Sequence, residues 1–423
     1  MQQCTIEIFD RGQWQPCCIV ETENPSAGSQ SPSVLTYLPA YAEKGSLPVS
    51  IHFPGRKKPY HLSHWPSFLL DMVPRGEGRE YLLYECHIPE ELATDWKLML
   101  VGAINPIGNL RIAEANAFYR NFLSKKAPLW VNRGFTIKEI LERSENFVEY
   151  LEEHGMLSAG TTCVQGKTPK FLMTQGKDDL WYADAALPDG KAARHFLVKL
   201  SRGRHLADWK ILENEAAYVR VAREMGLAVG ELPKWQSDML FIPRFDRTVT
   251  ETGVIRHHQE SIASLCQLAD ASERLTHNVA LKTLRKFVSD PFATTVEYLK
   301  RDILYMAMGN IDNHPFNKAV RMLDGKIGLT PIFDFSPSCL LTDDIERSME
   351  WVDKKGDILD NWNDILDSLD IPPEEMSAVL VEIDRFAHKL DRLQDIMMQQ
   401  GVDEDIVDAR YYGIRNLRSQ LKN

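Results

Sequence analysis

The sequence has no long apolar run and no segment typical of a secretion signal. No stretch approaches the roughly 20 apolar residues that a membrane-spanning helix needs. The opening residues have neither a basic segment nor an apolar core of about 7–15 residues. We therefore expect a cytoplasmic protein that does not cross a membrane.

Cysteine pairs and an excess of positive charge are lacking as well. The seven cysteines are scattered and none forms a Cys-x-x-Cys pair, so we predict reduced thiols rather than disulfides or a metal site. Lysine and arginine number 49 against 60 aspartates and glutamates, which gives a net charge of −11. A chain of this charge is a poor candidate for direct binding to a nucleic-acid backbone.

The 423 residues, 44% of them hydrophobic, provide for two or three globular domains. Turn signals and apolar periodicity divide the chain into a β-rich part over 1–132, a linker helix with a small mixed lobe over 133–247, and a helical part over 248–423. In the first part, alternation over 47–51 predicts a strand. The linker is expected to hold one helix from Phe135 to about Glu153.

A polar loop over 309–317 contains the first residues with chemical potential. Asp312 and Asn317 lie in it, an acid followed by an amide. Taken alone, this loop is also typical of a plain turn, in which Asp and Asn side chains bind the nearby backbone.

The segment that follows makes the loop more informative. Asp324-Gly325 between two apolar segments predicts a two-residue hairpin turn. If Leu323 faces Lys326, the register brings Asn317 opposite Ile332. Asp334 then comes near Asp312 and Asn317, so that we expect these three side chains to converge.

Two carboxylates and an amide oxygen in a small space indicate a magnesium site. The two anions repel each other unless a cation lies between them, and ligands that are all oxygen suit Mg²⁺. Asn317 and Asp334 fit as ligands, which leaves Asp312 for the substrate. Kinases use an Asp to accept the hydroxyl proton, an Asn five residues later, and an Asp after the next hairpin.

A kinase also needs a cation on the nucleotide phosphates, and Lys199 in the apolar strand 196–200 is the candidate. The alternative is a lysine on an edge strand. A helix over 208–226 follows, in which Glu215 falls on the apolar stripe and is expected to pair with Lys199. Glu213 is the alternative if the helix is rotated.

The sequence contains no Walker A motif, so the phosphate-covering loop is sought before Lys199, over 157–170. Two glycines and several hydroxyl groups suit a backbone nest for an anion, although an ordinary surface hairpin has the same composition. The predicted nucleotide contacts of this loop are Gly160, Val164, Gln165, Gly166 and Lys167. On the base side, the backbone over 242–245 is the candidate hinge, with Ile242, Pro243 and Phe245.

Several motifs, taken in order, resemble the HipA family of bacterial serine/threonine kinases, the toxins of type II toxin–antitoxin pairs. The N-terminal likeness lies at 68–76 and 101–110. The kinase-domain likeness lies at 164–170, at Arg244-Phe245-Asp246-Arg247, at His258-Gln259-Glu260, and at 310–314 together with Asn317 and Asp334. The sequence departs from the family pattern at Ser261, where an acidic residue is usual, and in a longer phosphate loop.

This resemblance implies an α+β, two-lobed protein-kinase-like fold behind a β-rich N-terminal domain. It implies ATP and Mg²⁺ as cofactors, Asp312 as catalytic base with His314 in the catalytic group, Asn317 and Asp334 on the metal, and Lys199 on the phosphates. It further implies autophosphorylation, for which Ser158 is the matching position, and phosphorylation of a protein involved in translation. A small HipB-like DNA-binding antitoxin is the implied partner, through which DNA would be contacted.

Two other functions remain open from the residues. A small-molecule kinase of the aminoglycoside or lipid type would use the same Lys, Asp, Asn and Asp. A catalytically inactive kinase-like protein could instead sequester an antitoxin. A purely structural or nucleic-acid-binding protein is disfavoured, because the sequence has no basic stripe or aromatic platform.

Overall fold

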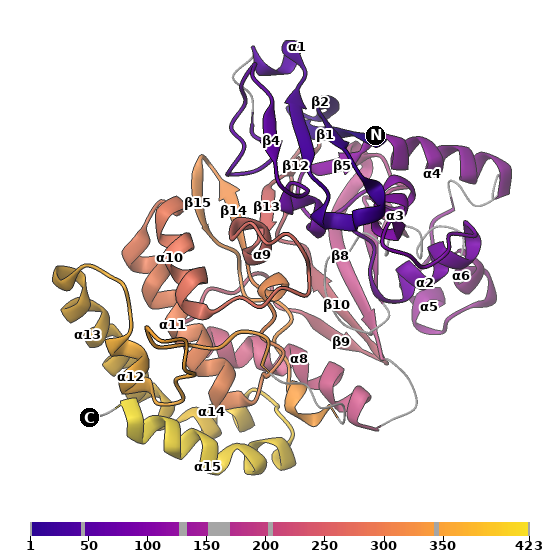
Figure 1. Cartoon of the computed structure of the whole chain (residues 1–423). Coiled ribbons are helices and arrows are strands. Elements are labelled where there is room, and N and C mark those ends of the chain that lie inside the picture. Colours follow the sequence, from indigo (N-terminus) through magenta and orange to yellow (C-terminus); the bar gives the residue numbers. More distant parts are fainter. Residues whose placement is uncertain are drawn as a thin grey trace. The chain divides into compact units, whose positions relative to one another are not determined.

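The computed structural model describes residues 2–43, 47–126, 133–150, 170–201, 206–341 and 347–421. The chain divides into two compact units, the first formed by Met1–Leu200 with Gln236–Glu273 and the second by Ser201–Trp235 with Arg274–Asn423 (Figure 1). Strands dominate the first unit and helices the second, so the predicted α+β class with a β-rich N-terminal part is confirmed. The predicted domain boundaries near 132 and 247 stay predictions.

The first unit opens with an antiparallel sheet in the order β4-β3-β2-β1-β5. Alternate residues of β1 form part of the core of this sheet. Cys4, Ile6 and Ile8 of β1 are fully buried, and Ile6 pairs with Cys18 of β2. The β1–β2 turn is Arg11-Gly12, both with positive φ (51° and 79°), as a two-residue hairpin requires. Helices α3 and α4 pack against each other, and α4 packs on β1 (Figure 1).

The elements of this N-terminal part are β1 (Gln2–Asp10), β2 (Gln13–Thr22), η1 (Pro25–Gln30), β3 (Ser33–Tyr37), α1 (Pro39–Ala42), β4 (Tyr60–Leu62), η2 (Ser67–Asp71), α2 (Gly76–Glu85), α3 (Thr94–Gly102), β5 (Leu110–Ile112) and α4 (Ala113–Lys126). The strand predicted over 47–51 is wrong. Residues 49–51 form a bend and a turn instead, and Val49 and Ser50 are fully buried without belonging to a strand.

The single helix predicted from Phe135 to about Glu153 is wrong as well. Two short helices occupy the described part, α5 (Ile137–Leu141) and α6 (Glu145–Tyr150). Thr136 starts α5 with a reciprocal capping box with Glu139. Arg143, with φ 47°, then reverses the backbone and forms an ion pair with Asp238. This left-handed residue is what divides the predicted helix into two.

A second sheet follows in the order β7-β6-β8-β10, with the boundary strand β9 beside β10. Its core is aromatic, and Trp181 contacts Phe196 and Phe241 with ring centroids 4.9 and 5.5 Å apart. The remaining elements of the unit are β6 (Lys170–Gly176), β7 (Trp181–Ala183), η4 (Asp189–Lys191), β8 (Ala192–Leu200), β10 (Met239–Pro243), β11 (Arg247–Val249), β12 (Val254–Arg256), β13 (His258–Ser261) and α9 (Ile262–Leu265). The boundary strand is β9 (Lys234–Gln236), of which only Gln236 belongs to the first unit.

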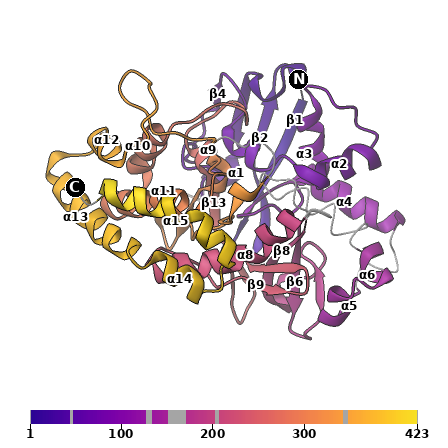
Figure 2. The same ribbon diagram turned by 90° about the horizontal axis from the view of Figure 1, so that it is seen from below.

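The second unit is built on a long helix, α11 (Pro291–Met308), which runs through its core. Asp290 caps the start of α11, and Gly309 ends it in the left-handed conformation at φ 76°. Helix α15 packs on α11, α12, α13 and α14, and Figure 2 shows it lying across α11. The other elements are α8 (Leu206–Glu224), α10 (His277–Phe287), η5 (Pro315–Asn317), β14 (Ala319–Leu323), β15 (Lys326–Leu329), η6 (Ser338–Leu340), α12 (Trp362–Asp367), α13 (Pro373–Leu390), α14 (Leu393–Gln399) and α15 (Glu404–Leu421).

The hairpin predicted after the polar loop is confirmed. Strands β14 and β15 pair with Leu323 opposite Lys326. The turn residues Asp324 and Gly325 both have positive φ, 51° and 73°. Among the described residues, no helix combines the length and the apolar character needed to cross a membrane.

Candidate active site

The loop that follows α11 is hydrogen-bonded to the segment that contains Asp334. The side chain of Asn310 donates to the carbonyl oxygens of Asp334 and Ser336 at 3.3 and 3.1 Å. The hydroxyl of Ser338 accepts from the backbone N–H groups of Ile311 and Asp312 at 2.8 and 3.0 Å. These bonds hold Asp312 and Asp334 on two adjacent segments.

Asn317 completes this group of oxygen-bearing residues. Its Nδ2 donates to the carbonyl oxygen of Asp312 at 3.4 Å. Its Oδ1 is buried and has no hydrogen-bond partner among the described residues, which is costly unless a ligand binds there. Asp312, Asn317 and Asp334 therefore lie on segments that hydrogen bonds hold next to each other, while the convergence of their side chains and their roles stay predictions.

Asp334 itself has an unusual backbone conformation. Its φ is 54°, in the left-handed region that costs a non-glycine residue free energy. Strain of this kind is concentrated at functional sites, where it aims a side chain. Asp312, His314 and Asp334 are all half-buried.

A buried polar network lies beneath the loop, and it was not anticipated from the sequence. Asn313 Oδ1 accepts from the N–H groups of Ser348 and Met349 at 3.0 and 3.2 Å, and its Nδ2 donates to the Met349 carbonyl at 2.9 Å. Lys318 Nζ donates to the Asn313 carbonyl at 3.0 Å. The loop is thereby fixed to the segment over 347–352.

The charges in this network compensate one another. Asp302 accepts from Arg347 at 2.8 Å and from the Trp351 indole at 2.9 Å. Burial lowers the pKa of His277 to about 3, although Asp302 raises it, so this imidazole is neutral and accepts from Asn313 Nδ2 at 3.1 Å. Burial also lowers the pKa of Lys318 to about 8, again opposed by Asp302.

Lys199 lies on β8, in the middle of the second sheet of the first unit. It faces Lys170 of β6 on one side and Leu240 of β10 on the other, and only 4% of it is exposed. The alternative of an edge-strand lysine is wrong, because β8 is paired on both sides.

Glu215 is on the inward face of α8 in the second unit. It is 3% exposed, whereas Glu213 is exposed, so the expected choice of Glu215 as the inward-facing acid is confirmed. The predicted ion pair between Glu215 and Lys199 stays a prediction.

The comparisons with known proteins agree with this geometry. Residues 162–390 match the HipA-like C-terminal domain, a span of more than half of the chain. The chain belongs to the HipA family. Residues 26–113 also match the HipA N-terminal domain, so the predicted resemblance is confirmed.

Two solved structures are similar to this HipA-family chain. One is HipA of Shewanella oneidensis MR-1, from a toxin–antitoxin complex with HipB and its operator DNA, with a TM-score of 0.65 and 16% identity, covering 99% of this chain and 96% of that one. At this identity the likeness shows the shared fold. The other is the Helicobacter pylori proinflammatory kinase CtkA, with a TM-score of 0.38 and 13% identity, covering 54% of this chain and 87% of that one. No curated protein matches the sequence significantly.

The predicted phosphate loop of this HipA-family chain lies outside the described residues. The predicted site residues that lie there are Ser158, Gly160, Val164, Gln165, Gly166 and Lys167. The candidate hinge is described: Ile242 and Pro243 end β10 opposite Leu197 and Phe196. Pro243 has no N–H and offers a bound base only its carbonyl oxygen.

The charged residues of the HipA-family motif at 244–247 face inward. Asp246 Oδ2 accepts from Arg244 Nη2 and Arg247 Nη1, both at 2.6 Å. Arg244 Nη1 also donates to Asp184 at 2.9 Å. The candidate hinge over 242–245 overlaps this motif, and the buried charge cluster was not anticipated from the sequence.

The His258-Gln259-Glu260 motif is likewise internal. Glu260 accepts from His258 Nε2 at 2.8 Å, from the Ser50 hydroxyl at 3.0 Å and from the backbone N–H of Ile51 at 2.6 Å. The hydrogen bonds of this buried carboxylate therefore join the matched C-terminal domain to residues of the matched N-terminal domain. At the departure from the family pattern, Ser261 caps α9 and its N–H donates to Asp71 at 2.9 Å.

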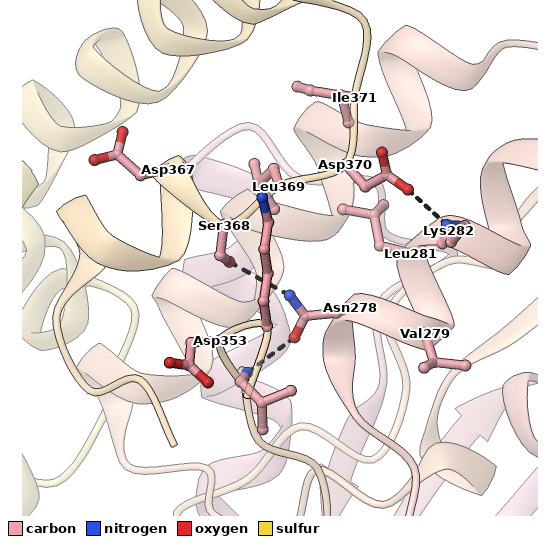
Figure 3. Close-up of a pocket in the computed structure, with 12 residues that line it drawn as sticks. Asn278, Val279, Leu281, Lys282, Asp353, Asp367, Ser368, Leu369, Asp370 and Ile371 are labelled. Carbon is pink, nitrogen blue, oxygen red and sulfur yellow. Dashed lines mark hydrogen bonds and ion pairs between the residues drawn. The ribbon is translucent and has the colours of Figure 1, made fainter. Parts of the chain in front are cut away.

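A cavity of about 470 Å³ lies in the second unit, between the start of α10, the segment over 352–354 and the α12–α13 connection (Figure 3). Asn278 spans one side of it, accepting from the Val352 N–H at 2.9 Å and donating to Ser368 at 3.3 Å. Lys282 pairs with Asp370 at 2.6 Å on the other side. The lining contains charges of both signs and none of the predicted site residues.

Proposed function

We propose that this chain is an ATP- and Mg²⁺-dependent protein serine/threonine kinase that acts as the toxin of a toxin–antitoxin pair. The observation that supports this most directly is the buried, unpartnered Oδ1 of Asn317, held beside the Asp312 backbone in a loop tied to strained Asp334. An amide oxygen and a carboxylate in such a place fit a hard cation.

The proposed roles follow from the chemistry of each residue. Asn317 and Asp334 would hold Mg²⁺, which when bound supplies positive charge to the phosphate oxygens. Asp312 accepts the proton of the acceptor hydroxyl and orients it, and His314 of the same loop belongs to the catalytic group. Lys199 binds the nucleotide phosphates, and a buried ammonium on a central strand is well suited to this because its charge is little screened by water.

The proposed substrate is a Ser or Thr hydroxyl of a protein involved in translation, with Ser158 as the site of autophosphorylation. A HipB-like DNA-binding antitoxin is the proposed partner. The Shewanella oneidensis HipA was solved with HipB and operator DNA, and a chain with a net charge of −11 is better suited to reach DNA through a basic partner than by itself.

The decisive experiment is incubation of the purified chain with Mg²⁺ and γ-labelled ATP, alone and with a cell lysate, followed by mass spectrometry. The variant is Asp312→Asn, and the matched control is Asp324→Asn, which changes an exposed acid in the nearby hairpin turn. We expect label on protein with the wild type and the control, and loss of at least about a hundredfold with Asp312→Asn.

Each other outcome points to a different function. Turnover that needs a small hydroxyl compound and labels no protein would favour a small-molecule kinase. ATP binding without any turnover would favour a protein that sequesters the antitoxin. Equal labelling by wild type and Asp312→Asn would remove Asp312 from the proposed mechanism.

A further inference from the structure

The motif Arg244-Phe245-Asp246-Arg247 has two faces. Arg244, Asp246 and Arg247 are buried, whereas Phe245 and the preceding Pro243 are half-buried. The candidate hinge thus has an outer side open to a ligand and an inner side turned into the first unit.

The inner side is bonded to a turn of the matched HipA N-terminal domain. The backbone N–H of Gly108 donates to Asp246 Oδ2 at 2.8 Å, and the Gly108 carbonyl accepts from Arg247 Nη1 at 2.6 Å. Arg244 Nη2 donates to the Pro106 carbonyl at 3.4 Å. Every charged side chain of the motif therefore contacts the turn over 105–108.

A second set of bonds supports the same turn. Asn105 donates to Asp184, which also accepts from Arg244 and from Thr174 at 2.6 Å. Asn105 Oδ1 accepts in turn from Arg256 at 2.5 Å. The turn is thereby joined to the sheet and to the motif through side chains that are almost wholly buried.

Electrostatics makes this arrangement rigid. Burial alone would raise the pKa of Asp246, but Arg244 and Arg247 outweigh it and hold the pKa below its ordinary value. Buried ions that compensate one another are costly to separate. The hinge backbone is held as well, because the Arg244 N–H donates to the His195 carbonyl and the His257 N–H to the Asp246 carbonyl, both at 2.9 Å.

We infer that the turn over 105–108 positions the hinge over 243–245, so that the N-terminal domain is a working part of the nucleotide site rather than an independent module. Gly108 and Asn105 are positioning residues in this scheme, since they act through Asp246 and Asp184. The inference rests on the proposed function, because contact between the hinge and the base of ATP is itself proposed.

The test compares two glycine variants of the full-length chain. Gly108 has φ 95°, and an added Cβ would lie 3.5 Å from the nearest atom, so Gly108→Ala adds backbone strain without a clash. Gly12→Ala is the matched control, because Gly12 also has positive φ (79°) and has nothing within 4 Å of the added Cβ. Both variants carry left-handed strain, but only the first moves the N–H that binds Asp246.

Binding of MgATP and of magnesium tripolyphosphate is measured by calorimetry, with the melting temperature recorded in parallel. We expect Gly108→Ala to weaken the binding of MgATP by about tenfold. The affinity for tripolyphosphate, which has no base, should stay unchanged. Gly12→Ala should leave both affinities unchanged. Should Gly108→Ala fail to fold, Asn105→Ala gives the same comparison, because it removes two side-chain bonds of the turn.

A lower melting temperature with unchanged MgATP affinity would overturn the inference, since the turn would then be structural only. An equal loss of affinity for MgATP and for tripolyphosphate would also overturn the inference, because the substitution would then not act through contacts with the base. If wild-type protein binds no MgATP, the proposed function fails and the inference falls with it. If wild type binds MgATP and all variants bind equally, the inference fails alone.

Discussion

Asn317 binds the backbone of Asp312 through its amide nitrogen, at 3.4 Å, while its amide oxygen is buried and has no hydrogen-bond partner among the described residues. One end of this side chain is thus used to hold the loop, and the other is left for a ligand. A buried amide oxygen without a partner, on a side chain bound to the Asp312 backbone, suits a hard cation such as Mg²⁺.

Replacing Asn317 should therefore raise the concentration of Mg²⁺ that the reaction needs. We expect Asn317→Ala to raise the Mg²⁺ concentration for half-maximal phosphorylation by at least about tenfold, in line with the loss of a ligand. The measurement is a Mg²⁺ titration of label transfer at saturating ATP. Asn363→Ala, on the exposed side of α12, is the control and should leave the titration unchanged. An unchanged titration for Asn317→Ala would exclude Asn317 as a ligand.

Replacing Asn313 should act on stability. Asn313 is fully buried and bonds to Ser348, Met349 and His277. Asn313→Ala leaves those buried groups without partners, at a cost of about 2–4 kcal/mol in the free energy of unfolding. Thermal unfolding measures this loss, and Asn416→Ala on the exposed side of α15 should cost less than about 0.5 kcal/mol. Equal melting temperatures for the two variants would contradict the network described above.

Replacing Asp246 should cost more free energy of unfolding than replacing an exposed acid of the same unit. Asp246→Asn leaves Arg244 and Arg247 with one fewer buried negative charge, and we expect a loss of about 3–5 kcal/mol. Glu43, which pairs with Lys57 at 3.0 Å, is 61% exposed at its side chain, and Lys57 is 74% exposed. Glu43→Gln should cost about 0–1 kcal/mol. Denaturant unfolding of both variants measures the two losses. Similar losses for the two variants would show that Asp246 behaves like an acid in a surface ion pair and not like part of a buried cluster.

Asp71 should make stability depend on pH. Burial raises the pKa of Asp71 to about 7, although bonds from Ser261 lower it. Because the folded-state pKa lies above the unfolded value, the contribution of Asp71 to stability is complete below about pH 4 and is lost as pH rises through about 7.

Asp71→Asn keeps an oxygen for the Ser261 N–H and removes the titration. Relative to wild type, we expect this variant to gain on the order of 4 kcal/mol in the free energy of unfolding between pH 4 and pH 8. Chemical denaturation at several pH values measures the difference. A difference that does not change with pH would show that Asp71 does not titrate in this range.

Local signals in the sequence were sufficient for several elements. Asp324-Gly325 predicted the β14–β15 hairpin and its register, because φ above zero at both positions is encoded by those two residues. The stripe on α8 separated buried Glu215 from exposed Glu213. The spacing of Asp312, Asn317 and Asp334 also indicated that their segments lie next to each other.

Features that depend on distant partners could not be predicted in the same way. Arg143 interrupts the helical segment over 137–150 in a left-handed conformation, and nothing in the local pattern marks it. The buried charge cluster of the motif at 244–247 was not predicted, because its partners, Gly108 and Asp184, lie far away in the sequence. For the same reason Asn313 looked like an ordinary loop residue, although it bonds to Met349.

Gly309 links the end of α11 to the polar loop, and it has two requirements at once. Its φ of 76° suits glycine, and an added Cβ would lie 2.6 Å from the Cys339 sulfur. Any side chain there would push the loop and the segment over 334–339 apart. A mutational scan of this protein should therefore show that Gly309 tolerates no substitution, although glycine has no functional group. The requirement at this position is for the absence of a side chain.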